Sequence, residues 1–328
     1  MIEIMGFFQN KVRKNSDEFM LRDYFKIIIL IISCYIIIHY SSFPKEVISS
    51  NSHYIFTFWE PKNSKPPYLS LCLKTWRKNL PAYYKIVILN YSNLENYLSS
   101  KLIKQILCKD MDLATQVDAI RIALLYKYGG FWIDADTVII NSNIMNTFYD
   151  SELVMFSYSK LKIHYTGFIY ASRNSKIIKI WLNCIISRVK IYRHSLTLKH
   201  IFSRKLFNFL FSKLSVWSYL SNGILDRFTN NVSEKEFKRI EIEDAYALPE
   251  QVLLKGNRPN CYINFYFSPN YNMSWLKKCK GVLLLHNSWT PKRFKKMNET
   301  QFLSQNIMLA HLLSKILNGT NKFYIQHK

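Results

Sequence analysis

The sequence predicts an α/β protein built on a single mixed, mostly parallel sheet that is flanked by helices. Short runs of β-branched and aromatic residues alternate with segments of helical spacing from residue 54 to residue 140. Parallel strands need crossover connections of this kind. Polar residues follow several of these strands, and open sheets of this class bind ligands at the carboxyl ends of their strands. Hydrophobic residues make up 49% of the chain, which is enough for a sizeable core.

The first half of the sheet is expected from four segments that precede an acidic motif. Aromatic and β-branched runs indicate strands, and apolar residues three or four apart indicate helices. We expect a strand at Tyr54–Trp59, a helix at Tyr68–Asn79, a buried strand at Tyr84–Leu89 and a helical segment at Leu94–Leu107.

The segment Thr115–Ile140 is the centre of the predicted architecture. Its first part, to Tyr128, has helical spacing, with Thr115 as the expected N-cap. Gly129 and Gly130 follow, and glycine ends helices because it adopts left-handed torsions at little cost. Residues 131–140 then predict a buried strand that is interrupted by two carboxylates.

These two carboxylates, Asp134 and Asp136, need a physical reason to lie between apolar runs. A desolvated carboxylate costs several kcal/mol unless it is paired or bound to a metal ion. At a strand end the pair could hold a divalent cation through hard oxygen ligands. Asp118 and Arg121 lie three residues apart on one face of the preceding helix. We expect both to point into the pocket that the carboxylates line.

Further elements are expected after the acidic motif. The patterns predict strands at Leu153–Ser159, Thr166–Ala171 and Gly281–Leu285, a short strand or turn at Phe237–Ile242, and helices at Ser175–Val189, from Ser221 to about Phe228, and at Thr300–Leu317. Residues 190–215 are basic and aromatic and predict a helical insertion that could lie on an anionic membrane surface.

The motifs of the central segment resemble a known class of enzyme. Asp118-x-x-Arg121, then Leu-Tyr-Lys-Tyr-Gly-Gly, then an aromatic strand ending in Asp134-x-Asp136, resembles the capsular-polysaccharide-synthesis and DXD sugar-transferase families. The opening strand and the helix that ends at Pro81 are similar to the same families. The resemblance implies a GT-A-like glycosyltransferase, hexosyltransferase-like, that uses a nucleotide-sugar donor and Mn²⁺ or Mg²⁺. The nearest of these families suggest a retaining reaction.

The resemblance also implies roles for individual residues. Asp136 and His286, which directly follows a buried strand, would bind the metal, and Asp134 would contact the ribose, the sugar or the metal. Asp118 and Arg121 would hold the donor sugar and its phosphates. Two aromatic residues of the first strand, Tyr54 and Trp59, could stack on the nucleobase. One or more cations among Lys292, Arg293, Lys295 and Lys296 could neutralise the departing diphosphate.

The charge and the N-terminus suggest partners and location. The net charge of +23 favours an anionic partner, and no nucleic-acid-binding motif is present. An apolar run at Ile27–Ile38 predicts an N-terminal anchor helix within residues 1–50, followed by a transferase domain at 51–320 and a tail at 321–328. We expect attachment to the cytoplasmic face of a bacterial inner membrane, or alternatively a Golgi type II membrane protein. The expected acceptor is a glycan or a lipid-linked glycan.

Two other functions are compatible with the sequence. The motif Ile133–Val138 also matches a phosphohydrolase pattern of the haloacid-dehalogenase type, in which Asp134 would be the nucleophile. A non-enzymatic, basic, membrane-bound protein that binds anionic polymers would explain the charge and the apolar run. That alternative does not explain carboxylates between buried apolar runs.

Overall fold

The structure, a computed structural model, is described for residues 53–61, 65–158, 163–198, 219–225, 232–242, 245, 258–269, 279 and 281–319. It contains a six-stranded sheet of order β2-β1-β3-β6-β5-β7 and a two-stranded sheet of β4 and β8. The strands are β1 His53–Phe58, β2 Tyr84–Leu89, β3 Gly130–Ile133, β4 Thr137–Ile139, β5 Leu153–Tyr158, β6 Ile163–Ala171, β7 Phe237–Glu241 and β8 Val282–Leu284. A mixed sheet flanked by helices is therefore confirmed.

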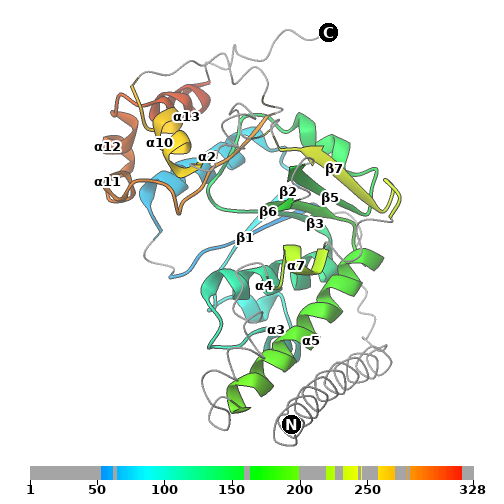
Figure 1. The fold of residues 1–328 in the computed structure, drawn as a ribbon. Helices are drawn as coiled ribbons and strands as arrows, with labels where there is room; N and C mark the ends of the chain where they lie inside the picture. Colours follow the sequence, from blue (N-terminus) through cyan, green and yellow to red (C-terminus); the bar gives the residue numbers. More distant parts are fainter. Residues whose placement is uncertain are drawn as a thin grey trace, which may run out of the picture. The chain divides into compact units, whose positions relative to one another are not determined.

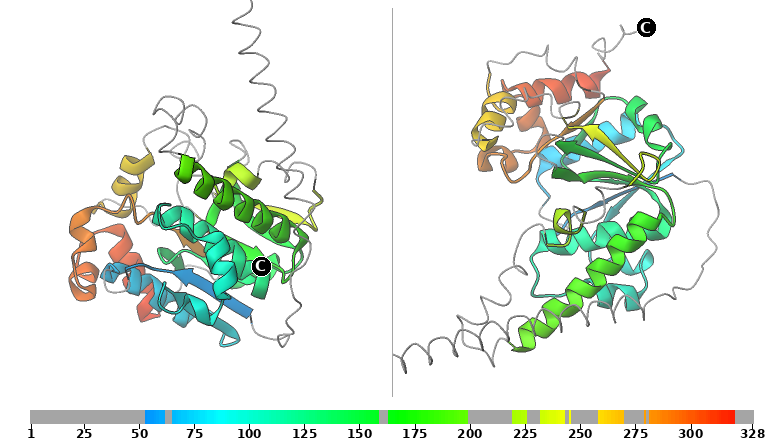
Figure 2. Two further views of the ribbon diagram at one scale, coloured as in Figure 1. Left: turned by 90° about the horizontal axis from the view of Figure 1, so that it is seen from below. Right: turned by 45° about the vertical axis from the view of Figure 1, so that its right-hand side comes forward.

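The helices connect and cover these strands (Figure 1). They are α2 Pro67–Asn79, α3 Ser100–Ile106, α4 Leu113–Tyr128, α5 Lys176–Leu198, α7 Asn222–Leu225, α10 Arg258–Tyr266, α11 Lys292–Lys295, α12 Glu299–Leu303 and α13 Met308–Asn318, with 3-10 turns at Leu94–Asn96 and Asn143–Phe148. Helix α5 runs beside α4 in both views of Figure 2.

The strand directions identify one edge of the large sheet, at which β1, β2 and β3 end; we call it the functional edge. Strands β1, β2 and β3 are parallel, so their carboxyl ends meet at the same edge. Strand β6 is antiparallel to β3, with Ile133 opposite Phe168, and therefore begins at that edge. The residues that follow β1 and β3 and those that begin β6 are thus neighbours, although they are far apart in the sequence.

The two faces of this sheet bury separate hydrophobic clusters, as the period of two residues in a strand requires. Ile55 and Phe131 point to the face covered by α2, α10, α12 and α13. Phe56 and Trp132 point to the face covered by α3, α4, α5 and α7. The two helical layers lie on opposite sides of the sheet in Figure 1.

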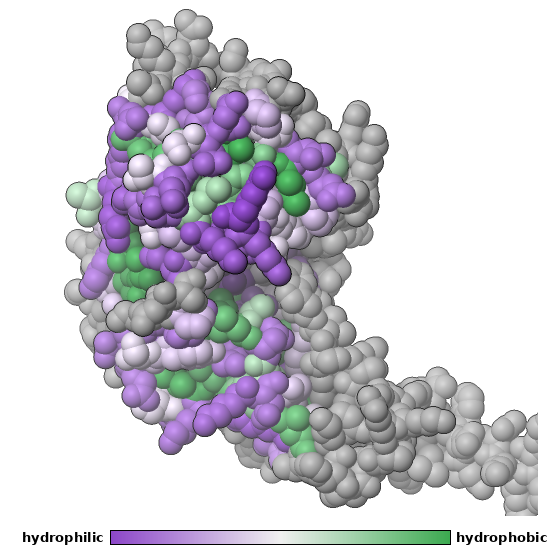
Figure 3. All heavy atoms as spheres, turned by 90° about the vertical axis from the view of Figure 1, so that its left-hand side faces the viewer, coloured by the Kyte–Doolittle hydropathy of each residue, from purple (hydrophilic) through white to green (hydrophobic). Residues whose placement is uncertain are grey.

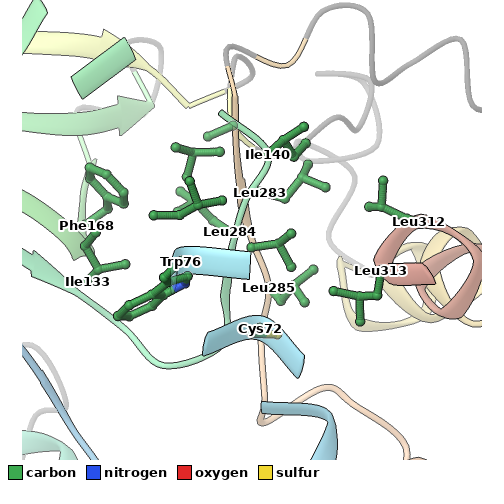
Figure 4. Packing of buried hydrophobic residues seen from close by; sticks show 14 of the residues in the cluster. Cys72, Trp76, Ile133, Ile140, Phe168, Leu283, Leu284, Leu285, Leu312 and Leu313 are labelled. Atoms are coloured by element: carbon green, nitrogen blue, oxygen red, sulfur yellow. The ribbon is translucent and has the colours of Figure 1, made fainter. Parts of the chain in front are cut away.

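The two-stranded sheet was not expected from the sequence. The predicted strand 131–140 is two strands, because Asp134 to Asp136 form a turn in which the Thr137 N–H donates to the Asp134 carbonyl. Strand β4 then leaves the large sheet and pairs with β8, so that Val138 lies opposite Leu283. Figure 4 shows Leu283, Leu284 and Leu285 between Trp76 on α2 and Leu313 on α13. This pairing brings the turn after β8 beside the acidic motif.

Local capping differs from the sequence prediction at two helices. The N-cap of helix α4 is Asp112, three residues before the expected Thr115, because the Asp112 carboxylate accepts the backbone N–H of Thr115. The expected helix at 300–317 is two helices, α12 and α13, and a capping box formed by Asn298 and Gln301 fixes the start of the first. The predicted end of α4 is confirmed, since Gly129 has φ of 67°.

The expected membrane attachment is corrected. Among the described residues, no helix combines the length and the apolar character needed to cross a membrane. The apolar run at 27–38, the proposed division near residue 50 and the tail at 321–328 lie outside the described residues, as do residues 199–215 of the expected basic insertion. Its first residues, to Leu198, simply continue α5.

Candidate active site

Asp134 directly follows β3 at the functional edge of the sheet and is held from several directions. Its Oδ1 accepts hydrogen bonds from Trp132 Nε1 at 2.7 Å and from Arg121 Nη2 at 3.2 Å. Its backbone N–H donates to the carbonyl of Gly167 on β6 at 2.7 Å. The side chain is still 35% exposed, so this carboxylate is fixed in place yet accessible from the surface.

Arg121 is a buried bridge between two carboxylates. Its Nη1 lies 2.9 Å from Asp118 Oδ1, and the guanidinium also stacks over the ring of Trp132. Asp118 is buried as well, and the Ser221 side chain donates a hydrogen bond to it. Asp118 and Arg121 therefore adjoin the acidic motif, as expected. Their burial makes them supports of Asp134 and not open contacts for a donor molecule.

Asp136 is held by the turn after β8. Its Oδ2 accepts the backbone N–H of Asn287 at 2.7 Å, across 151 positions of sequence. The Asn287 side chain in turn accepts a hydrogen bond from the Tyr68 hydroxyl on α2. The small β4–β8 sheet thus joins the acidic motif to the turn that begins at His286.

His286 lies in an aromatic environment. Its ring centroid is 3.9 Å from that of Trp289, 5.9 Å from that of Tyr262 and 6.1 Å from that of Tyr165. Its backbone N–H donates to the Tyr262 hydroxyl. The predicted neighbourhood of His286 and the acidic motif is therefore present, through Asn287 and through Tyr165 of β6.

Burial and mutual repulsion raise the pKa of two of the acids. Loss of solvation raises the pKa of Asp118 to about 6 despite the neighbouring Arg121. Loss of solvation and the negative charge of Asp134 raise the pKa of Asp136 to about 7. Lys295 on α11 partly offsets this charge, and burial lowers the pKa of Lys295 itself. A cation beside Asp136 would stabilise its ionised form.

The described residues do not contain a complete metal-binding cluster. No three His, Cys, Asp or Glu side chains in this part of the chain are grouped closely enough to hold a metal ion, so Asp134, Asp136 and His286 are not gathered as three ligands. Carboxylate oxygens and imidazole nitrogens are nevertheless suitable donors. Mg²⁺ commonly takes one or two carboxylates together with substrate phosphates and does not need a cage made of protein alone.

The two predicted nucleobase contacts have different positions. Tyr54 lies near the amino end of β1, stacked on Phe56, and its carbonyl is beside Gly130 at the start of β3. Because the site lies at the carboxyl end, the structure does not bring Tyr54 to it, and the partly buried Tyr54 ring packs against the core. Trp59 directly follows β1 at the functional edge, and its buried Nε1 has no hydrogen-bond partner among the described residues.

Several site residues were not predicted. Trp132, Tyr165 and Gly167 contact or adjoin Asp134, while the Asn287 backbone holds Asp136 and Tyr68 holds the Asn287 side chain. The only sequence signal for Asn287 was its position directly after the strand and His286. Of the four cations after Trp289, Lys295 is the one that acts on Asp136, while Lys292, Arg293 and Lys296 are exposed. Figure 3 shows hydrophilic side chains over most of the upper part of the face that carries α11 and α12.

A comparison with protein families supports the resemblance. The model of the family described as capsular polysaccharide synthesis protein matches residues 9–240, which include the acidic motif and Arg121. The chain belongs to this family. Family membership supports assignment of the chain as a glycosyltransferase. The matched residues end before His286, so its role does not follow from membership.

Comparisons with individual proteins do not extend this assignment. Among solved structures, the PaToxG glycosyltransferase is similar to this chain with 16% sequence identity and a TM-score of 0.35, over 54% of this chain and 70% of the other. No curated protein matches the sequence.

Proposed function

We propose that this family member is a metal-dependent glycosyltransferase that moves a sugar from a nucleotide-sugar donor to a glycan or lipid-linked acceptor in the synthesis of a capsular or surface polysaccharide. One observation carries the proposal. Asp134 and Asp136 lie at the carboxyl edge of the sheet, supported by Arg121 from one side and by the turn after His286 from the other. Ligands of open α/β sheets bind at this edge.

The metal in this proposal is Mn²⁺ or Mg²⁺, and Asp136 and His286 would hold it, with Asp134 close by. The raised pKa of Asp136 supports the assignment, because burial and the charge of Asp134 disfavour its ionised form and Lys295 only partly offsets them. The missing ligands would be oxygens of the donor diphosphate. Such an ion supplies Lewis-acid stabilisation to the leaving nucleoside diphosphate.

The protein residues have separate tasks in the proposal. Asp134 contacts the ribose or the sugar, and Arg121 and Asp118 keep its carboxylate in position. Trp59 at the end of β1 contacts the nucleotide, and its Nε1, which has no hydrogen-bond partner in the described part of the chain, would gain one when a ligand binds. Lys295 balances charge on the diphosphate. A retaining reaction would need no separate general base.

The phosphohydrolase alternative receives no support from the geometry. The family that matches the chain is one of capsular polysaccharide synthesis, and the two hydrogen bonds that Asp134 Oδ1 accepts make it a poorer nucleophile. If the protein consumes no donor, the remaining interpretation is a protein that binds anionic polymers without catalysis.

Donor hydrolysis tests the proposal. The full chain is incubated with uridine- and guanosine-diphosphate sugars in the presence of Mn²⁺, Mg²⁺ or EDTA, and release of free sugar is measured. We expect metal-dependent release from one donor, lost with EDTA. No release from any donor, with no binding of donor or Mn²⁺ by calorimetry, would contradict the proposal.

A further inference from the structure

The helical layer that contains α2, α11, α12 and α13 is strongly basic. Residues 65–79 and 281–319, which form this layer together with β8, contain nine Lys or Arg residues and one acid, Glu299. One carboxylate can balance only one of these cations, so the layer keeps a large positive charge. We call the cations at 65–77 and at 292–296 the basic surface. Most of them are exposed to solvent, while Lys65 and Lys295 are partly buried.

Aromatic packing brings the two halves of the basic surface together. Tyr68 of α2 stacks on Phe302 of α12, with the ring centroids 5.7 Å apart, and Phe302 meets Phe294 of α11 at 6.1 Å. The helices α2, α11 and α12 therefore lie on the same side of the large sheet, as Figure 1 shows. Because Phe294 is buried, its neighbours Lys292 and Arg293 are left on the outside. The face that carries α11 and α12 is accordingly hydrophilic over most of its upper part (Figure 3).

The cations of the first half lie close to one another. Lys74 forms an ion pair with Glu299. Burial and the positive charge of Arg77 lower the pKa of Lys65, and Glu299 acts on Lys65 in the opposite direction. Three cations are thus gathered around a single carboxylate. Like charges at short range repel each other, and an anionic group bound between them would relieve this repulsion.

The basic surface begins at the acidic motif. Lys295 of α11 lies near enough to Asp136 for the two charges to interact. The Tyr68 hydroxyl of α2 donates to the Asn287 side chain, and the Asn287 N–H donates to Asp136. Both helices that carry the basic surface therefore adjoin the site. A polymer with one end at the acidic motif would extend across these cations.

A repeating anion fits this surface better than the donor does. In the proposed function the nucleotide lies at the end of β1, and its diphosphate accounts for Lys295. Lys74 and Arg77 lie further along α2 and need another anionic partner. An acidic glycan carries carboxylate or phosphate groups at regular intervals, so successive groups can meet successive cations. The sequence has none of the motifs that would favour a nucleic acid instead.

We propose that the basic surface binds an acidic glycan, bearing carboxylate or phosphate groups, and directs its end to the acidic motif as the acceptor. This inference rests on the proposed transferase function and names the chemical class of its acceptor. A neutral glycan would gain nothing from these cations and should bind much more weakly.

The test compares two double variants of the full chain that remove the same charge from opposite helical layers. Lys65→Gln with Arg77→Gln changes the basic surface, and Lys101→Gln with Lys104→Gln changes exposed cations of α3. Calorimetry at about 50 mM salt, where surface charges are weakly screened, measures the Kd of oligomers of hyaluronan, of poly(ribitol phosphate) and of neutral dextran. Donor hydrolysis and the Tm are measured in parallel.

We expect wild type to bind at least one of the two acidic glycans and to bind dextran at least tenfold more weakly. Lys65→Gln with Arg77→Gln should weaken acidic-glycan binding by about tenfold, since two surface ion pairs are lost. The α3 double variant should change this Kd by less than about twofold. Donor hydrolysis and the Tm should be those of wild type in both variants, because water replaces the acceptor in that reaction.

The outcomes separate the inference from the proposed function. Equal binding of acidic and neutral glycans, or equal losses in the two double variants, would overturn the inference, while donor hydrolysis would still support the transferase. Single-stranded DNA or phosphatidylserine vesicles that bind as tightly as the acidic glycans, with the same loss in Lys65→Gln with Arg77→Gln, would also overturn it. A wild type that hydrolyses no donor but binds acidic glycans selectively would overturn the proposed function and the acceptor role, and would leave a glycan-binding surface.

Discussion

Arg121 Nη2 lies 3.2 Å from Asp134 Oδ1, so a cation of α4 holds the carboxylate that follows β3. The same guanidinium is paired with Asp118, so one positive charge forms ion pairs with two carboxylates. Both Arg121 and Asp118 are buried. Removing one partner would therefore leave a buried charge without its counter-charge, which lowers stability. The position of Asp134 depends on this pairing.

Replacing Arg121 tests that dependence. Arg121→Met leaves two carboxylates without their shared cation, and we expect the free energy of unfolding to fall by about 3–5 kcal/mol. Chemical denaturation measures it. The control is Lys74→Met, which removes an exposed ion pair with Glu299 and should cost less than about 1 kcal/mol. Equal, small losses in both variants would contradict the supporting role of Arg121.

Gly167→Ala should impair activity more than stability. The added methyl group would displace Asp134 Oδ2 or the Tyr165 ring, and a shift of about 1 Å at a reacting centre can cost on the order of 100-fold in rate. The control is Gly319→Ala, where the φ of 83° strains any side chain but the nearest atom is 3.5 Å away. That variant should lose stability only. Wild-type donor hydrolysis by Gly167→Ala would show that the close packing is irrelevant.

The raised pKa of Asp118 predicts a pH dependence of stability. The folded chain retains this proton up to about pH 6, whereas the unfolded chain releases it near the ordinary value of 3.8. Between these values the folded state binds more protons, so this group's contribution to stability falls as the pH rises, by about 3 kcal/mol in total. Denaturation from pH 3.5 to 7 should show a flatter profile for Asp118→Asn than for wild type. Parallel profiles would exclude the predicted shift.

Local sequence patterns predicted most of the individual elements. Strands β1 and β2 and helix α2 match their expected ranges within a few residues, because hydrophobic periodicity and Pro or Gly punctuation are local signals. The acidic motif and its neighbours Asp118 and Arg121 were found for the same reason. Their close packing follows from a helix and a strand that are adjacent in sequence.

Long-range pairing explains what the sequence did not predict. The β4–β8 sheet joins residues more than 140 positions apart, and no local pattern identifies such partners. The hydrogen bond from Asn287 to Asp136 depends on that pairing. The position of Tyr54 away from the site has a related reason: an aromatic residue at either end of a strand has the same local signal, and only the direction of the sheet shows which end forms the site.

Lys295 should contribute to diphosphate binding. It is the cation of α11 that acts on Asp136, while Lys296 beside it is exposed. We expect Lys295→Ala to weaken the binding of a free nucleoside diphosphate about tenfold, since hydrogen bonds to charged groups contribute about 1.5–3 kcal/mol. Lys296→Ala is the matched control and should change the Kd less than about twofold. Equal effects of the two variants would mean that the basic run acts only as a diffuse surface charge.

The most direct measurement of the central claim is nucleoside diphosphate release from the hydrolysed donor by wild type and Asp136→Asn. Asp150→Asn is the matched control, because Asp150 is an exposed acid outside the acidic motif. We predict Mn²⁺- or Mg²⁺-dependent release by wild type and Asp150→Asn, and a loss of at least about 100-fold in Asp136→Asn, as for removal of one key electrostatic contact. Equal release by all three proteins, or release that EDTA leaves unchanged, would contradict a metal-dependent glycosyltransferase centred on Asp136.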